Sequence, residues 1–402
     1  MADVTDTVVG KAVVGKAVVA QRCTAQLLSG PPERSALAVV GRLLAVQGQD
    51  PRGARLAVRA RSAGLTAADV DRALTAERSL LITWLNRGTL HLIAAEDYWW
   101  LHALTAPPVA QGVARRLGQQ GVSQADTDRA VGVIDAALAA DGPLTRADLR
   151  ERIAAAGVRT QGQALVHLLA SASLQGLIVR GPIAGREHAY VRVADWLGPR
   201  PAAFGPSSFD RSAALAELAR RYLAGHGPAT ARDLAKWSGL PLGDARRGLA
   251  AIAAELRERP DGLAELARSA AQPEIAGSVA ALVPPRLLGS FDPLLHGWSD
   301  RGPVLGQHAE VVTVNGLFRP FALAGGRAVA TWTLDGGEVA LAPFRPLPEP
   351  VAAALRDDAA DVLRFLGLRP RGPAGQQPCP GAGKPAEMAP GKSAEPRATL
   401  AE

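Results

Sequence analysis

Two glutamines separated by a glycine, Gln47, Gly48 and Gln49, form the stretch of this sequence best suited to chemistry. They precede a helix that we expect to begin at Pro51 with Asp50 as its N-cap. The pattern predicts that both amides are held at a helix–helix corner, where the glycine lets another backbone or a ligand come close. An amide carbonyl accepts a proton from water and turns its dipole toward developing positive charge. A Gln-x-Gln at a turn is also typical of a solvated corner. The neighbouring elements must therefore distinguish a functional site from a solvated corner.

The elements after this corner predict a winged helix-turn-helix unit. A helix is expected from Pro51 to Ala63, and Thr66 is expected to cap the next helix, at 67–74. Two apolar strands, 80–85 and 89–93, flank a turn. With the apolar helix expected at 36–46, three helices followed by a hairpin within about 75 residues are the order of a winged helix.

The same order recurs twice more along the chain. The segment GPLTRADL at 142–149 is echoed by GPATARDL at 227–234, and each opens a helix after a Gly-Pro turn. Thr145 and Thr230 are the expected caps. We therefore expect three tandem winged helix-turn-helix units, which together can wrap a duplex.

Several polar side chains on these units are candidates for contact with DNA. Arg52, Arg55 and Arg59 share one helical face, which is either a phosphate contact or a solvated face. Arg246 and Arg247, on the third helix of the third unit, carry the same two alternatives. Gln163 opens the third helix of the second unit within a second Gln-Gly-Gln, which is either a coincidence of a helix start or a DNA contact.

The character of the chain changes to strands after residue 281. Strands are expected at 311–314, 318–323, 328–334 and 339–344, with a closing helix at 350–366, which suggests a small antiparallel barrel or sheet. The fold class expected is mainly α with β, ending in a β-barrel-like domain. The expected division is a disordered extension at 1–19, winged helices at 20–120, 121–205 and 206–280, the β-rich domain at 281–368 and a disordered tail at 369–402.

Composition favours nucleic acid as the partner. The net charge is +7, and 40 of the 45 basic side chains are arginine, which forms bidentate contacts with phosphate. The two cysteines, Cys23 and Cys379, lie far apart, so we expect a reducing compartment, no disulfide and no zinc site. No apolar run approaches the length of a membrane span. We expect a cytoplasmic bacterial protein with no metal, no cofactor and no membrane partner.

Two segments, LAVQGQDP at 44–51 and WLNRGTLH at 84–91, together form a specific combination of motifs. They resemble the catalytic segment and the "RGTLH" wing of the AlkZ/YcaQ-like winged-helix DNA glycosylases. LLGSFDPLL at 287–295, with Asp300 and Arg301, resembles their C-terminal "yDn…DR" segment, and Trp332 lies in a strand like their "G-x-W". The resemblance covers about residues 20–368 in the same order.

The resemblance implies a concave DNA-binding body of three winged helices and a β-rich domain. It implies monofunctional, metal-free excision of N7-alkylated purines from double-stranded DNA, without lyase activity. Some members unhook interstrand crosslinks or remove bulky natural-product adducts as antibiotic self-resistance. Gln47 and Gln49 take the catalytic places of the AlkZ-like branch. Gly48 departs from the family, whose middle residue is usually apolar.

The resemblance also places the wing and the C-terminal segment beside the site. Arg87, Thr89 and His91 are the wing candidates for lesion or DNA contact, with a buried structural role for His91 as the alternative. Asp292 and Arg301 are expected to form an ion pair, either structural or bordering the cleft.

Glutamine suits such a substrate because an N7-alkylated base is cationic and departs without a general acid. The remaining tasks are to position water and to stabilise the sugar cation. The alternatives are a winged-helix transcription regulator and a non-catalytic damage-binding protein. We expect the glycosylase to be a monomer.

Overall fold

The computed structural model describes residues 15–185, 187–205, 207–257, 259–267, 283–313 and 316–370. The expected extension at 1–19 lies mostly outside these ranges, as do Val314 of the expected strand at 311–314, Cys379 and nearly all of the expected tail. Helix α1 (Lys16–Ala25) begins inside the extension that was expected to be disordered. Among the described residues, no helix is both long and apolar enough to cross a bilayer.

The first unit has the expected order of three helices and a hairpin. Its elements are α2 (Ala36–Leu43), the short strand β1 (Val46–Gln47), α3 (Pro51–Arg59), α4 (Ala67–Thr75), β2 (Leu80–Leu85) and β3 (Thr89–Ala94). Asp50 caps α3 by accepting from the backbone N–H of Arg52 at 3.0 Å. Thr66 and Asp69 form a capping box on α4, so both caps that the sequence predicted are confirmed.

The second unit follows a long helix that the sequence pattern did not delimit. Its elements are α5 (Tyr98–Gln119), α6 (Gln124–Asp141), α7 (Arg146–Ala155), α8 (Ala164–Leu174), β4 (Ile178–Ala184), β5 (Glu187–Arg192) and the short α9 (Val193–Leu197). The side chain of Thr145 caps α7 in a capping box with Asp148. Tyr98 at the start of α5 is fully buried, as expected of a core aromatic residue.

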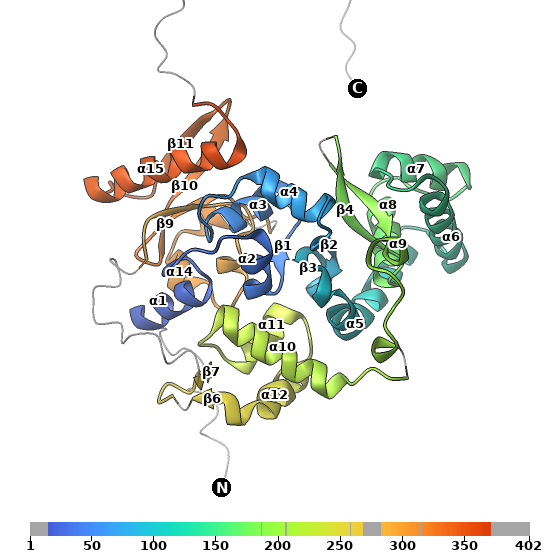
Figure 1. The fold of residues 1–402 in the computed structure, drawn as a ribbon, viewed down its shortest axis with the longest axis horizontal. Helices are drawn as coiled ribbons and strands as arrows, with labels where there is room; N and C mark the ends of the chain where they lie inside the picture. The colour runs from blue at the N-terminus through green and yellow to red at the C-terminus, as the bar shows by residue number, and fades with distance from the viewer. Residues whose placement is uncertain are drawn as a thin grey trace, which may run out of the picture. The chain divides into compact units, whose positions relative to one another are not determined.

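The two hairpins join into one sheet, which separate wings did not predict. The five strands run in the order β1-β3-β2-β4-β5. The junction is the antiparallel pairing of Ile82 with Arg180. In Figure 1 this sheet lies between the helices of the first unit and those of the second. The first wing is therefore an interior part of a continuous sheet.

The third unit repeats the pattern on a smaller scale. Its elements are α10 (Arg211–His226), α11 (Ala231–Ser238), α12 (Leu242–Ala251), β6 (Leu256–Arg257) and β7 (Glu265–Leu266). Thr230 caps α11 in a capping box with Asp233, so the repeated Gly-Pro and cap signature marks the same local structure in both units.

The C-terminal part is an open antiparallel sheet covered by a helix. Its elements are β8 (Arg286–Leu288), α14 (Gly302–Leu305), β9 (Phe321–Ala324), β10 (Arg327–Asp335), β11 (Glu338–Pro343) and α15 (Glu349–Leu366). The strand order is β11-β10-β9-β8, and the described residues show no pairing of the two edge strands, so the expected barrel-like closure is not found. The strand expected at 311–314 is also wrong, because 309–311 form a 3-10 turn with one bridge from Val312 to Phe318.

Candidate active site

Strand β1 holds Gln47 against the first wing. Val46 pairs with Leu92 and Gln47 pairs with His91 of β3, both antiparallel. The expected helix–helix corner is therefore corrected to a strand between two helices. Leu44 ends α2 with a φ of 64° and turns the chain onto the free edge of the sheet, where the backbone of β1 finds hydrogen-bond partners.

The two glutamine side chains are in direct contact. Gln47 Nε2 donates to Gln49 Oε1 at 2.5 Å. The Gln47 side chain is buried, with 6% of the residue exposed, whereas Gln49 is exposed. Gln47 Oε1 is buried and has no hydrogen-bond partner among the described residues. The pair thus leaves a buried carbonyl oxygen of Gln47 without a donor, while the amide nitrogen of the exposed Gln49 forms no bond among the described residues.

Gly48 is packed onto the sheet, so of the two approaches expected at it, that of another backbone is found and that of a ligand is not. Its N–H donates to the carbonyl of Leu90 at 2.7 Å. A Cβ at this position would lie 3.4 Å from Ile82 Cγ2 and 3.4 Å from the backbone nitrogen of Leu92, which is an ordinary contact distance. Its backbone is not in the left-handed region. The fold therefore holds the two glutamines at the required spacing without needing glycine between them.

The wing turn is anchored to the third unit. Arg87 has a left-handed backbone with a φ of 58°, and its guanidinium donates to the carbonyls of Lys236 and Trp237 at the end of α11. Burial, and then the charge of Arg301, lower the pKa of Arg87 to about 10. The Thr89 hydroxyl donates to the carbonyl of Asn86 at 3.2 Å. Arg87 and Thr89 therefore stabilise the wing in the free protein.

His91 is a buried neutral imidazole beside the glutamine pair. It is 2% exposed, and its Nδ1 lies 3.0 Å from the carbonyl of Thr89. Burial, and then the charge of Arg87, lower its pKa to about 3. Because a neutral ring donates from only one nitrogen, this bond places the proton on Nδ1. The structural alternative that the sequence left open describes the free protein.

Asp292 does not pair with Arg301, so that expectation is wrong. Asp292 is fully buried and receives both arms of the Arg61 guanidinium, at 2.8 and 2.9 Å. Arg301 donates instead from Nε to the carbonyl of Leu295 at 2.7 Å and lies over the ring of Phe318. Asp292 carries out a structural task, because Arg61 is itself completely buried and requires a carboxylate partner.

His296 is a residue of this neighbourhood that the sequence pattern missed. Its ring packs against Phe318 with centroids 4.3 Å apart, and its Nε2 is buried without a partner among the described residues. Burial, and then the charges of Arg87, Arg301 and His91, lower its pKa well below the usual range. The signal in the sequence was only a histidine following the FDPLL segment. Only the tertiary structure brings the wing and the C-terminal segment together.

The arginine face of α3 divides into three environments. Arg52 is exposed and forms no side-chain bond among the described residues. Arg55 pairs with Asp71 at 2.5 Å. Arg59 is 3% exposed and binds Asp358 at 2.7 Å and the carbonyl of Leu287 at 3.2 Å. Arg59 is therefore removed from the expected DNA face, because its guanidinium is occupied in the core.

The remaining candidates lie on helices of the second and third units. Gln163 is exposed at the N-cap of α8, where its side chain makes no capping bond. Arg246 and Arg247 are exposed on α12, and Arg247 is in contact with Asp244 of the same helix. None of the three belongs to the sheet that carries Gln47.

Known proteins are similar to this chain over most of its length. A family model described as "DNA glycosylase AlkZ-like" matches residues 40–365. The "Interstrand DNA cross-link repair glycosylase" of Streptomyces sahachiroi is 28% identical over 368 residues, which span 86% of this chain and 95% of that protein. The solved structure of Streptomyces sahachiroi DNA glycosylase AlkZ is similar with a TM-score of 0.69 at 26% identity, over 88% of this chain and 97% of that one.

Proposed function

Because the chain belongs to the AlkZ-like DNA glycosylase family, we propose that Gln47 and Gln49 are the groups with which it hydrolyses the N-glycosidic bond of N7-alkylated purines. The enzyme is a DNA glycosylase, a hydrolase of N-glycosyl bonds. The observation that carries the proposal is the buried carbonyl oxygen of Gln47, which has no partner while its own amide is fixed on Gln49.

The chemistry matches neutral amides. An N7-alkylated purine carries a positive charge, so the base departs without protonation and the sugar gains oxocarbenium character. The Gln47 oxygen supports that cation or orients the attacking water, and Gln49 fixes the Gln47 amide so that the dipole needs no reorganisation. Such positioning contributes about 10²–10⁴-fold to a rate, which is sufficient for an already labile bond.

Acidic groups close to the pair in the sequence or the fold have other tasks. Asp50 accepts the N–H of Arg52 as a helix cap, and Asp292 is bound to Arg61 in the core. This arrangement favours a substrate that carries its own positive charge over an intact purine.

The proposed substrates include bulky adducts and interstrand crosslinks in duplex DNA. The relative in Streptomyces sahachiroi is named for cross-link repair. Gln49 is exposed, so one member of the pair is reachable from the surface. The exposed candidates Arg52, Gln163, Arg246 and Arg247 are proposed to contact the duplex, and the protein is proposed to act as a monomer.

The proposal is tested by single-turnover excision on duplexes that contain one N7-methylguanine or one N7–N7 crosslink, with abasic sites cleaved by hot alkali. We expect wild-type enzyme to release the base and Gln47→Ala to lose most of the rate. Gln307→Ala is the matched control, because Gln307 is exposed and forms no side-chain bond among the described residues. Full excision by Gln47→Ala would contradict the catalytic role. Binding of the damaged duplex without release by wild-type protein would indicate a damage binder.

A further inference from the structure

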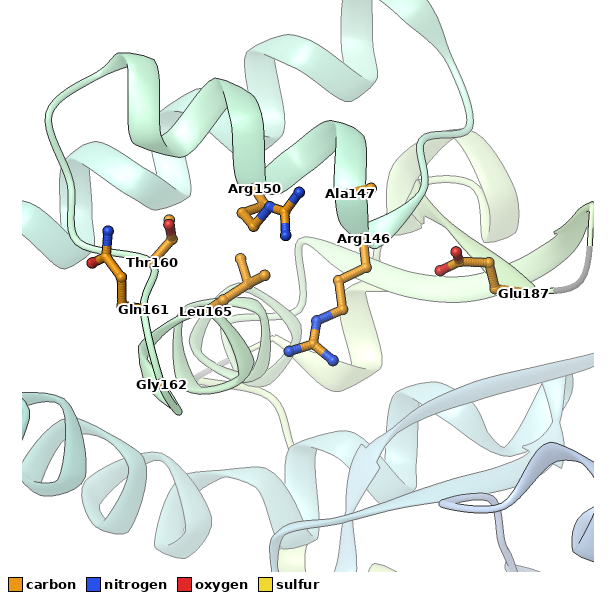
Figure 2. A pocket seen from close by; sticks show the side chains of 8 residues that line it. All are labelled: Arg146, Ala147, Arg150, Thr160, Gln161, Gly162, Leu165 and Glu187. Carbon is orange, nitrogen blue, oxygen red and sulfur yellow. The ribbon is translucent and has the colours of Figure 1, made fainter. Parts of the chain in front are cut away.

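A cleft of about 790 Å³ lies on the second unit, on elements other than those that carry the glutamine pair. Figure 2 shows Arg146 and Arg150 reaching from α7 into the space beside the 160–162 loop, with Leu165 of α8 on the loop side of both and Glu187 of β5 at the rim. Thr160 and Gln161 add a hydroxyl and an amide to the lining. Two guanidinium groups and one carboxylate thus line an open, polar cleft.

The side chains of these two arginines have no partners in the part of the chain that the structure describes. Among the described residues, neither Arg146 nor Arg150 makes a hydrogen bond or an ion pair, and both are exposed. Arg152 on the same helix behaves differently, because it binds Asp141 at 2.6 Å. Unneutralised guanidinium groups placed together repel each other unless an anion joins them. The cleft therefore has the positive charge and the N–H donors that suit an anion.

The fold does not require these arginines. When the two helices are aligned on their shared caps, Thr145 with Thr230, the places of Arg146 and Arg150 are taken in the third unit by Ala231 and Ala235. Those alanines are partly buried against a hydrophobic cluster. The same helix position is thus a packing surface in the third unit and an open basic cleft in the second.

The elements around the cleft indicate which kind of anion it binds. Helices α7 and α8 form a helix-turn-helix, and Gly162 turns the connection with a φ of 62°. In helix-turn-helix proteins the second helix faces the DNA groove while the first lies across the backbone. A cleft between the start of α7 and the start of α8 is located where the backbone passes.

We infer that the cleft binds backbone phosphate of duplex DNA through Arg146 and Arg150, as a site separate from the glutamine pair that holds undamaged as well as damaged duplex. The inference rests on the proposed function for its partner, because a DNA glycosylase must engage duplex around a lesion. Its binding requires no lesion, since phosphate contacts carry no base information.

The test measures the affinity of the full-length protein for an undamaged duplex across a range of salt concentrations. For the Arg146→Ala/Arg150→Ala variant we expect binding weakened on the order of tenfold, and the slope of log K against log salt reduced by about 1.8, because two phosphate contacts are lost. The variant is expected to fold, since the third unit has alanine at both places. Glu187→Gln is expected to strengthen binding, because it removes the carboxylate at the rim.

The matched control is the Arg327→Ala/Arg345→Ala variant, which removes two other exposed arginines and lowers the net charge by the same amount. Equal weakening by both double variants would overturn the inference, because it would reduce the effect to net charge. An unchanged slope in the cleft variant would overturn it as well. Competition by inorganic phosphate equal to that by duplex would show a small-anion site and would also overturn it.

Excision separates this inference from the proposed function. At saturating protein, the cleft variant is expected to keep the wild-type single-turnover rate on N7-methylguanine duplex, with only the half-saturating concentration raised. If wild-type protein excises nothing, the proposed function fails. The slope of log K against log salt still tests whether the cleft binds phosphate. If the cleft variant loses the saturated rate with unchanged binding, the cleft inference fails alone.

Discussion

Gln47 donates its amide hydrogen to the carbonyl oxygen of Gln49 across 2.5 Å, so the two glutamines form one hydrogen-bonded unit on the edge of the central sheet. The bond fixes the Gln47 amide from the exposed side, while strand β1 fixes its backbone from the buried side. Neither fixation alone would orient the free carbonyl oxygen.

The first prediction is that the two glutamines act non-additively. Gln47→Ala is expected to lower the saturated excision rate on the order of 10²-fold or more, and Gln49→Ala to lower it less. The double variant is expected to be little slower than Gln47→Ala, because Gln49 then has no amide to orient. Single-turnover rates of the wild type and the three variants complete the double-mutant cycle that measures this coupling. Multiplicative losses would show two independent catalytic groups.

The second prediction contrasts two glycines of the site. Gly48→Ala is expected to change the free energy of unfolding by less than about 1 kcal/mol, because the added Cβ meets Ile82 and Leu92 at ordinary contact distance. Gly53→Ala is expected to cost about 1–3 kcal/mol, because its Cβ would overlap the backbone carbonyl of Ser290. Urea denaturation followed by circular dichroism measures both.

Excision by the same proteins separates packing from chemistry. Gly48→Ala is expected to stay within a few-fold of the wild-type rate, since the spacing of the glutamines is set by β1 and α3. A hundredfold loss in a stably folded Gly48→Ala would show that the glycine itself serves the reaction.

The third prediction concerns the arginines of α3. Arg59→Ala is expected to lower the free energy of unfolding by about 3–5 kcal/mol, because it removes the buried cation of Asp358 and leaves only the partly exposed Arg286 beside that carboxylate. Arg52→Ala is expected to leave stability within about 0.5 kcal/mol and to reduce the salt slope of duplex binding by about 0.9.

Arg356→Ala is the control for the stability comparison, because its ion pair with Glu349 is exposed at both ends. It is expected to change stability by no more than about 1 kcal/mol. An Arg59→Ala protein of unchanged stability with a reduced salt slope of duplex binding would show that Arg59 contacts DNA.

The fourth prediction is a loss of stability in mild acid. Burial lowers the pKa of His91 and of His226 to about 3 and that of His102 and of His188 to about 4. Above pH 6.5 these side chains are neutral in both states, and their contribution is complete. As the pH falls below 6.5 the unfolded chain takes up protons first, so stability decreases until the folded pKa is reached.

Each of these histidines contributes a slope of up to about 1.4 kcal/mol per pH unit within its window. Urea midpoints at pH 5.5, 6.5 and 7.5 are expected to fall toward acid. His226→Gln is expected to flatten the dependence between pH 5.5 and 6.5. An equal slope in the variant would show that His226 does not titrate as its burial implies.

Local chemistry explains why much of the fold was predictable. The caps at Thr66, Thr145 and Thr230 are satisfied by carboxylates three residues away, and such pairs are legible in any window of the sequence. The helix–helix–helix–hairpin order follows from hydrophobic periods of equally short range. The repeated Gly-Pro signature then placed the same local structure in the second and third units.

The long-range partners were not predictable from those signals. Arg59 and Asp358 are 299 positions apart, and Arg61 and Asp292 are 231 apart. Nothing in the spacing of an arginine states whether its guanidinium will meet a phosphate or a buried carboxylate. The face of α3 was therefore expected to contact phosphate or to be solvated, and neither alternative describes Arg59, which lies in the core.

The sequence by itself determined which residues are the glutamine pair, the order of the elements around it and a basic, arginine-rich chain suited to DNA. The tertiary structure alone decided that Val46 and Gln47 form a strand on β3, that the two wings become one sheet and that Asp292 belongs to Arg61. The physical reason is range. Caps and periodicity act within a few residues, whereas strand pairing and the neutralisation of buried charge require groups that only the folded chain brings together.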